Sequence, residues 1–242
     1  MEKQQALTQQ EFYKLFILKE LQRFDQCVSD MYESLHREFP HKPHSRNHFF
    51  LAASKLKENH EIVLAYQEGR NKVYTVTTKG KQLYDSYIKQ FKDRFIALKK
   101  VADRFVYEIT GTGKAVPAGE VNDEDRNFFS TLVSVKDVVR YVLLKQAMNQ
   151  PVIVISETQE YIKDRFGWSS SKAFIYNIAH EMEEDETGPL ILGRWGSERR
   201  FKREYRIQPR GKEVFKQIAD AAETNVRQAQ HFLGDALKLF ES

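Results

Sequence analysis

Apolar side chains recur every three or four positions through most of the first hundred residues, which is the spacing of amphipathic helices. Two shorter runs rich in β-branched and aromatic residues instead flank the turn sequence EGRN, and this pattern indicates a hairpin. The predicted elements are helices over 8–24, 28–39 and 44–59, strands over 61–65 and 72–77, and a long helix over 81–109. This half is therefore expected to be mostly helical, with one small hairpin before its last helix.

A stretch rich in glycine, proline and charged residues follows at 110–127, and its composition is typical of a linker. After this stretch the same order of elements returns. The elements predicted there are helices over 135–148 and 156–166, a strand over 152–155, a serine-capped helix after Trp168, strands over 190–192 and 201–207, and a helix to the C-terminus. The chain is therefore expected to form two domains, 1–109 and 128–242, joined by the linker.

Individual residues also match between the two halves. Ser45, Phe50, Ala53 and Leu56 correspond at one constant offset to Ser171, Tyr176, Ala179 and Met182. Tyr74, Gly80, Lys81, Leu83 and Tyr84 correspond at a second, slightly larger offset to Tyr205, Gly211, Lys212, Val214 and Phe215. The extra residues of the second half fall in its hairpin, where an insertion disturbs a core least. The sequence therefore predicts an internal duplication.

Three helices followed by a hairpin are the elements of a winged helix-turn-helix domain. In such a domain the third helix enters the major groove of DNA, and the hairpin, or wing, contacts the phosphate backbone. The predicted fold class is accordingly mainly α with small β-wings (α+β). We expect two winged helix-turn-helix domains, each followed by a long heptad-patterned helix.

The sequence resembles PadR-type regulators, and it is similar to the bacterial replication terminator protein. The resemblance rests on an aromatic-x-x-Ala-x-x-Leu/Met pattern in each third helix and on Tyr74 and Tyr205, each followed by a Gly-Lys pair that opens a long helix. It covers almost all of each half. It implies a DNA-binding protein that dimerises through its long helices, although these families usually carry one winged helix per chain and this chain carries two.

Both long helices show the heptad spacing of a coiled coil. The apolar seam of the first is bulky, from Tyr84 to Phe105, whereas the seam of the second, from Phe215 to Phe240, is mostly small. Bulky side chains interdigitate well with small ones, so we expect the two helices to pack against each other within one chain or between chains. The alternative is that each helix only covers its own domain. Surplus apolar residues outside the seams predict a homodimer.

The net charge of +4 is mild for 242 residues, so the distribution of charge carries more information than its size. Basic residues gather in the second wing, at Arg194, Arg199, Arg200, Lys202 and Arg203. The first wing contributes Arg70 and Lys72. Such a run can be a solvated surface, but its position in the wing favours contact with phosphate. Trp195 could either insert toward a groove or brace the hairpin.

The first turns of the two third helices carry the side chains that would reach base edges. In the first half these candidates are His44, Ser45, Arg46, Asn47 and His48. In the second half they are Ser169, Ser170, Ser171, Lys172 and Tyr176. Arginine and asparagine make bidentate contacts with guanine and adenine edges. The serines could be helix caps, phosphate ligands or weak base readers.

Nothing in the sequence assembles catalytic residues, so an enzyme is not expected, and no cofactor is expected. His44 and His48 have helical spacing that could hold zinc, but no second cysteine or well-placed carboxylate accompanies them, so no metal site is expected. The sequence GTGK at 111–114 lacks the earlier glycine of a phosphate loop and follows a helix, so it belongs to the linker.

The same residues bear on localisation. No apolar run is long enough to span a bilayer, and the N-terminus has no signal-peptide core, so no membrane partner is expected. Cys27 is the only cysteine, which indicates a reducing compartment. We therefore expect a cytoplasmic, nucleoid-associated protein.

The function predicted from these patterns is sequence-specific binding of double-stranded DNA, as a transcriptional regulator (repressor) that reads two half-sites with paired winged helices. One alternative is a plasmid or phage replication or segregation control protein of the initiator or terminator kind. Another is a protein-interaction adaptor, which the less basic first wing favours for that half. The sequence does not identify an operator or a small-molecule effector.

Overall fold

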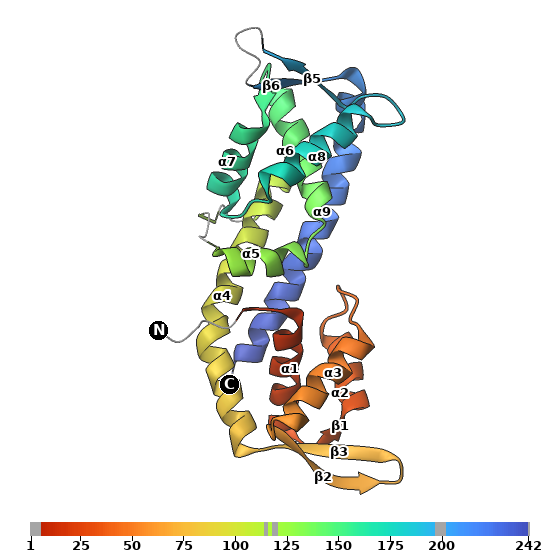
Figure 1. The fold of residues 1–242 in the computed structure, drawn as a ribbon, viewed down its shortest axis with the longest axis vertical. Coiled ribbons are helices and arrows are strands. Elements are labelled where there is room, and N and C mark those ends of the chain that lie inside the picture. The colour runs from red at the N-terminus through yellow and green to blue at the C-terminus, as the bar shows by residue number, and fades with distance from the viewer. Residues whose placement is uncertain (1–5, 114–115, 118–120, 197–201, 242) are drawn as a thin grey trace. The chain divides into compact units, whose positions relative to one another are not determined.

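The computed structural model describes residues 6–113, 116–117, 121–196 and 202–241 (Figure 1). The described chain is mainly helical and carries two small three-stranded antiparallel sheets, which confirms the α+β class. It divides into two compact units. The first comprises Met1–Lys99, Asp123–Phe128 and His231–Ser242, and the second comprises Lys100–Asn122 and Phe129–Gln230.

The first unit contains three short helices, a sheet and the first part of a long helix (Figure 1). Its elements are α1 (Gln9–Arg23), β1 (Gln26–Cys27), α2 (Val28–Glu38), α3 (Arg46–Glu58), β2 (Ile62–Glu68), β3 (Asn71–Val76) and α4 (Thr78–Thr110) as far as Lys99. The strand order is β1-β3-β2, so β2 is an edge strand. The two-residue strand β1 was not predicted, because Gln26-Cys27 lacks the run of β-branched residues that indicated a strand at 152–155 in the second half.

Helix α1 lies at the centre of the first unit, because consecutive residues on it are buried on different sides. The ring of Phe12 packs against Phe39 of the segment after α2 and against Phe232 of α9 (Pro209–Leu237), with centroids 5.1 and 5.0 Å apart. The ring of Tyr13 faces Phe49 of α3 at 5.4 Å. All five rings are buried. Phe232 explains why the C-terminal residues belong to the first unit.

The second unit repeats the order of the first (Figure 1). Its elements are the rest of α4, α6 (Val135–Asn149), β4 (Ile153–Val154), α7 (Ile155–Phe166), α8 (Lys172–Glu183), β5 (Ile191–Trp195), β6 (Arg203–Ile207) and α9 as far as Gln230. The strand order is β4-β6-β5, which matches the first sheet. Tyr74 of β3 pairs with β1 and Tyr205 of β6 pairs with β4, so the two tyrosines occupy the same register position.

The core of the second unit is built around Trp168, which is fully buried. Its ring lies edge-on to Phe105 and Phe129, with centroids 5.9 and 5.6 Å away. Phe105 in turn stacks on Phe166 at 3.9 Å. Trp168 therefore anchors the segment that leads into α8, and it contributes nothing to the exposed surface.

The same backbone contacts recur where each third helix meets its hairpin. The amide of Glu61 donates to the carbonyl of Leu56, and the amide of Leu190 donates to the carbonyl of Met182, both at 2.8 Å. A Cβ atom on Gly80 would lie 2.1 Å from the carbonyl oxygen of Glu61, and one on Gly211 would lie 2.2 Å from that of Leu190. The glycine of each Gly-Lys pair is therefore required by this close approach.

Several expectations need correction. The predicted linker is helical over its last residues, because α5 spans Asp123–Ser130. Arg94 of α4 and Asp125 of α5 form a buried ion pair, with Nε 2.8 Å from Oδ1, which places this segment in the first unit. Helix α7 begins at Ile155, one residue before the predicted start at 156, and has no side-chain cap.

The predicted seams of the long helices are largely buried. In the second unit Gln230 of α9 donates a hydrogen bond of 2.7 Å to Asp103 of α4. In the first unit Phe95 of α4 packs against Phe240 of the final 3-10 helix η1 (Lys238–Phe240), with centroids 5.3 Å apart. Pairing between two chains stays a prediction. None of the helices in the described ranges is both long and apolar enough to cross a membrane.

Candidate nucleic-acid interface

The first candidate surface is the N-terminal end of α3. Ser45 caps this helix, and its Oγ accepts the backbone N–H of His48 at 3.4 Å. A serine before the first turn satisfies an amide that would otherwise lack a partner, which explains why the helix starts there. The side chains of Arg46, Asn47 and His48 are exposed. Four of the five residues predicted at this helix start are thus accessible, and Ser45 among them also caps the helix.

His44 does not belong to this surface, contrary to expectation. Its side chain is only 7% exposed, and its Nε2 lies 3.1 Å from the carbonyl oxygen of Phe39. The hydroxyl of Tyr32 donates a hydrogen bond of 2.7 Å to the His44 carbonyl. Burial lowers the pKa of His44 to about 4, so the ring is neutral at physiological pH. His44 therefore fixes the turn before α3, and its ring is not part of the exposed surface.

The second candidate surface is the equivalent end of α8. Ser171 caps the helix by accepting the N–H of Phe174 at 3.2 Å, and Lys172 beside it is exposed. Ser169 is buried, and its Oγ donates to the carbonyl of Ser170. The Ser170 carbonyl also accepts a hydrogen bond from Gln159. The prediction of DNA contact is therefore corrected for Ser169, because its side chain is turned into the protein.

A cation and an aromatic ring one turn apart recur on both helices. The guanidinium of Arg46 lies over the ring of Phe50 at 5.3 Å, and the ammonium of Lys172 lies over the ring of Tyr176 at 6.0 Å. The pairs occupy equivalent positions of the two units. Such stacking holds a long side chain along the helix and limits its rotamers while its charge stays accessible. Sequence reasoning missed the role of Phe50, although the matching Tyr176 was predicted.

The second hairpin exposes cations only in part. Arg194 and Arg206 are exposed, and Trp195 at the end of β5 is 62% exposed. Lys202 pairs with Glu157 of α7 at 3.1 Å, an exposed contact that water and salt weaken. Arg199 and Arg200 lie outside the described residues.

Arg203 has a different environment from the rest of the second hairpin. Its guanidinium lies 2.9 Å from the carboxylate of Glu183 at the end of α8, and it also lies over the ring of Tyr205. Glu183 is largely buried and accepts the amide of Gly193 in β5 as well. Arg203 therefore joins helix to hairpin, and this structural role was not predicted.

The first hairpin is apolar along one strand. Val63, Leu64 and Tyr66 of the edge strand β2 are all exposed. The exposed cations of this hairpin are Arg70 in the turn and Lys72 in β3. Edge strands are usually protected by charged side chains, and this one has none between Ile62 and Gln67. The two hairpins thus present different chemistry despite the shared topology.

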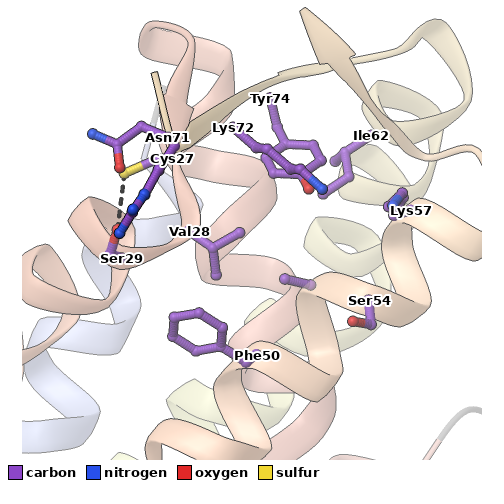
Figure 2. Close-up of a pocket in the computed structure, with 12 residues that line it drawn as sticks. Cys27, Val28, Ser29, Phe50, Ser54, Lys57, Ile62, Asn71, Lys72 and Tyr74 are labelled. Carbon is purple, nitrogen blue, oxygen red and sulfur yellow. Dashed lines mark hydrogen bonds between the residues drawn. The ribbon is translucent and has the colours of Figure 1, made fainter. Parts of the chain in front are cut away.

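A pocket of about 280 Å³ lies between α3 and the hairpin of the first unit (Figure 2). Lys57 reaches it from the last turn of α3, and Arg70 and Lys72 reach it from the hairpin. Phe50, Val28 and Ile62 provide apolar walls. No carboxylate lines the pocket among the described residues. Lys57 was not predicted as a site residue, because only the fold brings it next to the hairpin.

Comparison with known proteins does not assign a function to this surface. Models of protein families gave no match to the chain, and curated proteins gave no match either. Within the described ranges, no group of three or more histidine, cysteine or acidic side chains is placed to hold a metal ion.

Proposed function

We propose that the protein binds double-stranded DNA in a sequence-specific manner and acts as a transcriptional regulator through two winged helix-turn-helix units. The observation that carries the proposal is the arrangement common to both units. A serine-capped helix carries on its first turns an exposed cation that lies over a half-buried aromatic ring, beside an antiparallel hairpin with exposed cations. This is the arrangement in which a helix reads a major groove and a wing contacts phosphates.

The two units would make different contributions. Arg46 can donate two hydrogen bonds to a guanine edge, and Asn47 can donate one to an adenine edge while accepting another from it, so α3 supports base reading. Helix α8 presents Lys172 and Tyr176 instead, and its hairpin carries the larger number of cations. The preferred DNA would therefore contain two unlike half-sites. Occupancy of such a site near a promoter would block polymerase sterically.

A role in replication or segregation control would use the same contacts with DNA. It differs from the regulatory role in the location of the sites, which would be repeats at an origin or terminus. Sequencing the DNA that co-purifies with the protein from cells separates the two. Enrichment of promoter fragments supports regulation, and enrichment of origin repeats supports replication control.

The exposed apolar strand β2 favours a second candidate function for the first unit, that of a protein-interaction adaptor. Val63, Leu64 and Tyr66 form the kind of apolar surface that marks interaction sites on soluble proteins. In this case the second unit alone would bind DNA. Substitution of Arg46 and Asn47 would then leave DNA binding unchanged.

The test is the salt dependence of DNA binding in hairpin variants. Fluorescence anisotropy with duplex fragments selected from random sequence measures the affinity of the full chain at several salt concentrations. Combined Arg194→Ala and Arg206→Ala should weaken binding to all sequences and reduce the magnitude of the salt slope by about 2, because two phosphate contacts are lost. Lys216→Ala on α9 is the control, since Lys216 is exposed and pairs with Asp220. An unchanged slope in the double variant contradicts the proposal.

A further inference from the structure

One pair of equivalent positions carries different charges in the two units. The first position lies where the third helix ends, and the second lies where the inner strand of the hairpin begins. In the second unit these positions hold Glu183 and Arg203, whose side chains form an ion pair at 2.9 Å. The carbonyls of Leu56 and Met182 make equivalent hydrogen bonds at the ends of the two third helices. Lys57 directly follows Leu56, and Glu183 directly follows Met182. Lys57 is therefore the counterpart of Glu183.

The strand register identifies the other counterpart. Arg203 lies two residues before Tyr205, and Lys72 lies two residues before Tyr74, which has the same pairing partner in its sheet. The first unit thus places two lysines where the second places a carboxylate and a guanidinium. Both lysines line the pocket of about 280 Å³, Lys57 from the last turn of α3 and Lys72 from β3 (Figure 2).

Arg70 brings a third positive charge to this pocket. Across the described residues, no carboxylate lies within ion-pair distance of Lys57, Arg70 or Lys72. Like charges gathered around one cavity repel each other unless an anion lies between them. In the second unit the protein supplies that anion itself, as Glu183.

We propose that the pocket between α3 and the first hairpin binds a phosphate group, which takes the position that the Glu183 carboxylate occupies in the second unit. Lysine is a common ligand of phosphate, and arginine can bind two of its oxygens at once. Ser54 and Asn71 add polar side chains to the lining. The apolar walls formed by Phe50, Val28 and Ile62 leave room for an organic body attached to the phosphate.

The inference goes beyond DNA binding, because the phosphate could belong either to a small ligand or to a nucleic-acid backbone. The first experiment uses inorganic pyrophosphate as the probe and measures thermal unfolding of the full chain at matched ionic strength. Pyrophosphate at about tenfold its Kd should raise the melting temperature of the wild type by roughly 3–6 °C. The absence of any shift in the wild type overturns the proposal.

The decisive variant is Lys57→Glu, which restores the charge pattern of the second unit. The introduced carboxylate can pair with Lys72, as Glu183 pairs with Arg203, and should occupy the anion position. The pyrophosphate shift should therefore disappear. Lys89→Glu is the matched control, because Lys89 is an exposed residue of α4 outside the pocket and the change in charge is the same. An equal shift in Lys57→Glu and in the wild type contradicts the proposal.

A milder variant covers the case in which Lys57→Glu does not fold. Lys72→Gln keeps a polar, somewhat shorter side chain and removes one positive charge from an exposed strand position. It should weaken pyrophosphate binding by about tenfold in calorimetric titration, by loss of one charge-assisted contact. Unchanged affinity in this variant would equally overturn the assignment.

Duplex DNA then distinguishes the source of the phosphate. If the ligand is a small molecule, Lys57→Glu loses no more DNA affinity than the Lys89→Glu control, which carries the same change in charge. If it is a backbone phosphate, the variant loses DNA affinity together with the pyrophosphate shift, and the magnitude of its salt slope falls by about 1. A wild type that binds pyrophosphate but no DNA supports the pocket and contradicts the function proposed above.

Discussion

Glu183 and Arg203 connect the end of α8 to strand β6, with a carboxylate oxygen 2.9 Å from the guanidinium. The same carboxylate accepts the backbone amide of Gly193 in the neighbouring strand β5 at 2.6 Å. One largely buried side chain therefore fixes the position of both strands relative to the helix. Because Glu183 holds Arg203, the exposed Arg194 and Arg206 are the arginines of the described hairpin that can bind a ligand.

Replacing Glu183 by Gln should separate the stability of the hairpin from its affinity for nucleic acid. We expect the free energy of unfolding to fall by about 1–3 kcal/mol, because a charge-assisted pair in a largely buried position is lost. Nonspecific DNA affinity should rise, since Arg203 is released from its partner and the local negative charge is removed. Urea unfolding and anisotropy at two salt concentrations measure the two effects. A variant with lower stability and weaker DNA binding would contradict the expectation.

The glycines at the start of the long helices should not tolerate a methyl group. In Gly80→Ala the new Cβ would lie 2.1 Å from the carbonyl oxygen of Glu61, so the backbone must shift, at a cost of about 2–4 kcal/mol in unfolding free energy. Gly211→Ala should behave alike. Gly234→Ala in α9 is the matched control. Its new Cβ would meet only the end of the Lys99 side chain at 3.7 Å, so it should be neutral or stabilising by up to about 1 kcal/mol. Chemical denaturation compares the three.

His44 should make the protein less stable in mild acid. Burial lowers its pKa in the folded state to about 4, below the ordinary value of 6.5, so the unfolded chain binds a proton more readily. Its contribution to stability is complete above pH 6.5 and is lost as the pH falls toward 4. Between pH 7 and pH 5 the loss should be about 2 kcal/mol. Unfolding curves at both pH values measure it, and His44→Phe should show a correspondingly smaller difference. Equal pH dependence in the variant and the wild type would exclude His44 as the cause.

Asn47 should set preference at one base pair. Its side chain is exposed on the first turn of α3, beside the Arg46–Phe50 stack. Asn47→Ala should cost about 1–3 kcal/mol at the preferred sequence and little at other sequences, because an amide contact with a base edge is lost while phosphate contacts remain. Selection from random duplexes, followed by affinity measurements, gives both values. An equal loss of affinity at all DNA sequences would instead indicate that Asn47 contacts the DNA phosphate backbone.

Local patterns predicted the elements of this protein well. The third helix of the first half was predicted to begin near residue 44 and that of the second half after a run of serines, and Ser45 and Ser171 cap these helices in the structure. These predictions succeed because a cap and its amide are three residues apart, so the determining interaction lies within one short segment. The paired Gly80 and Gly211 were recognised from the sequence in the same way, although only the structure shows the carbonyl oxygen that each must avoid.

The sequence by itself determined the order of helices and hairpins, because helical periodicity, caps and turns depend on neighbouring residues. Tertiary structure decided which of the polar residues can act. It buried His44 and Ser169, paired Arg203 with Glu183, and brought Lys57 to the first hairpin. Each of these outcomes depends on residues that are separated along the chain and meet only when the helices pack against the sheet. Accessibility and pairing are therefore properties of the fold, which the pattern of any one segment does not contain.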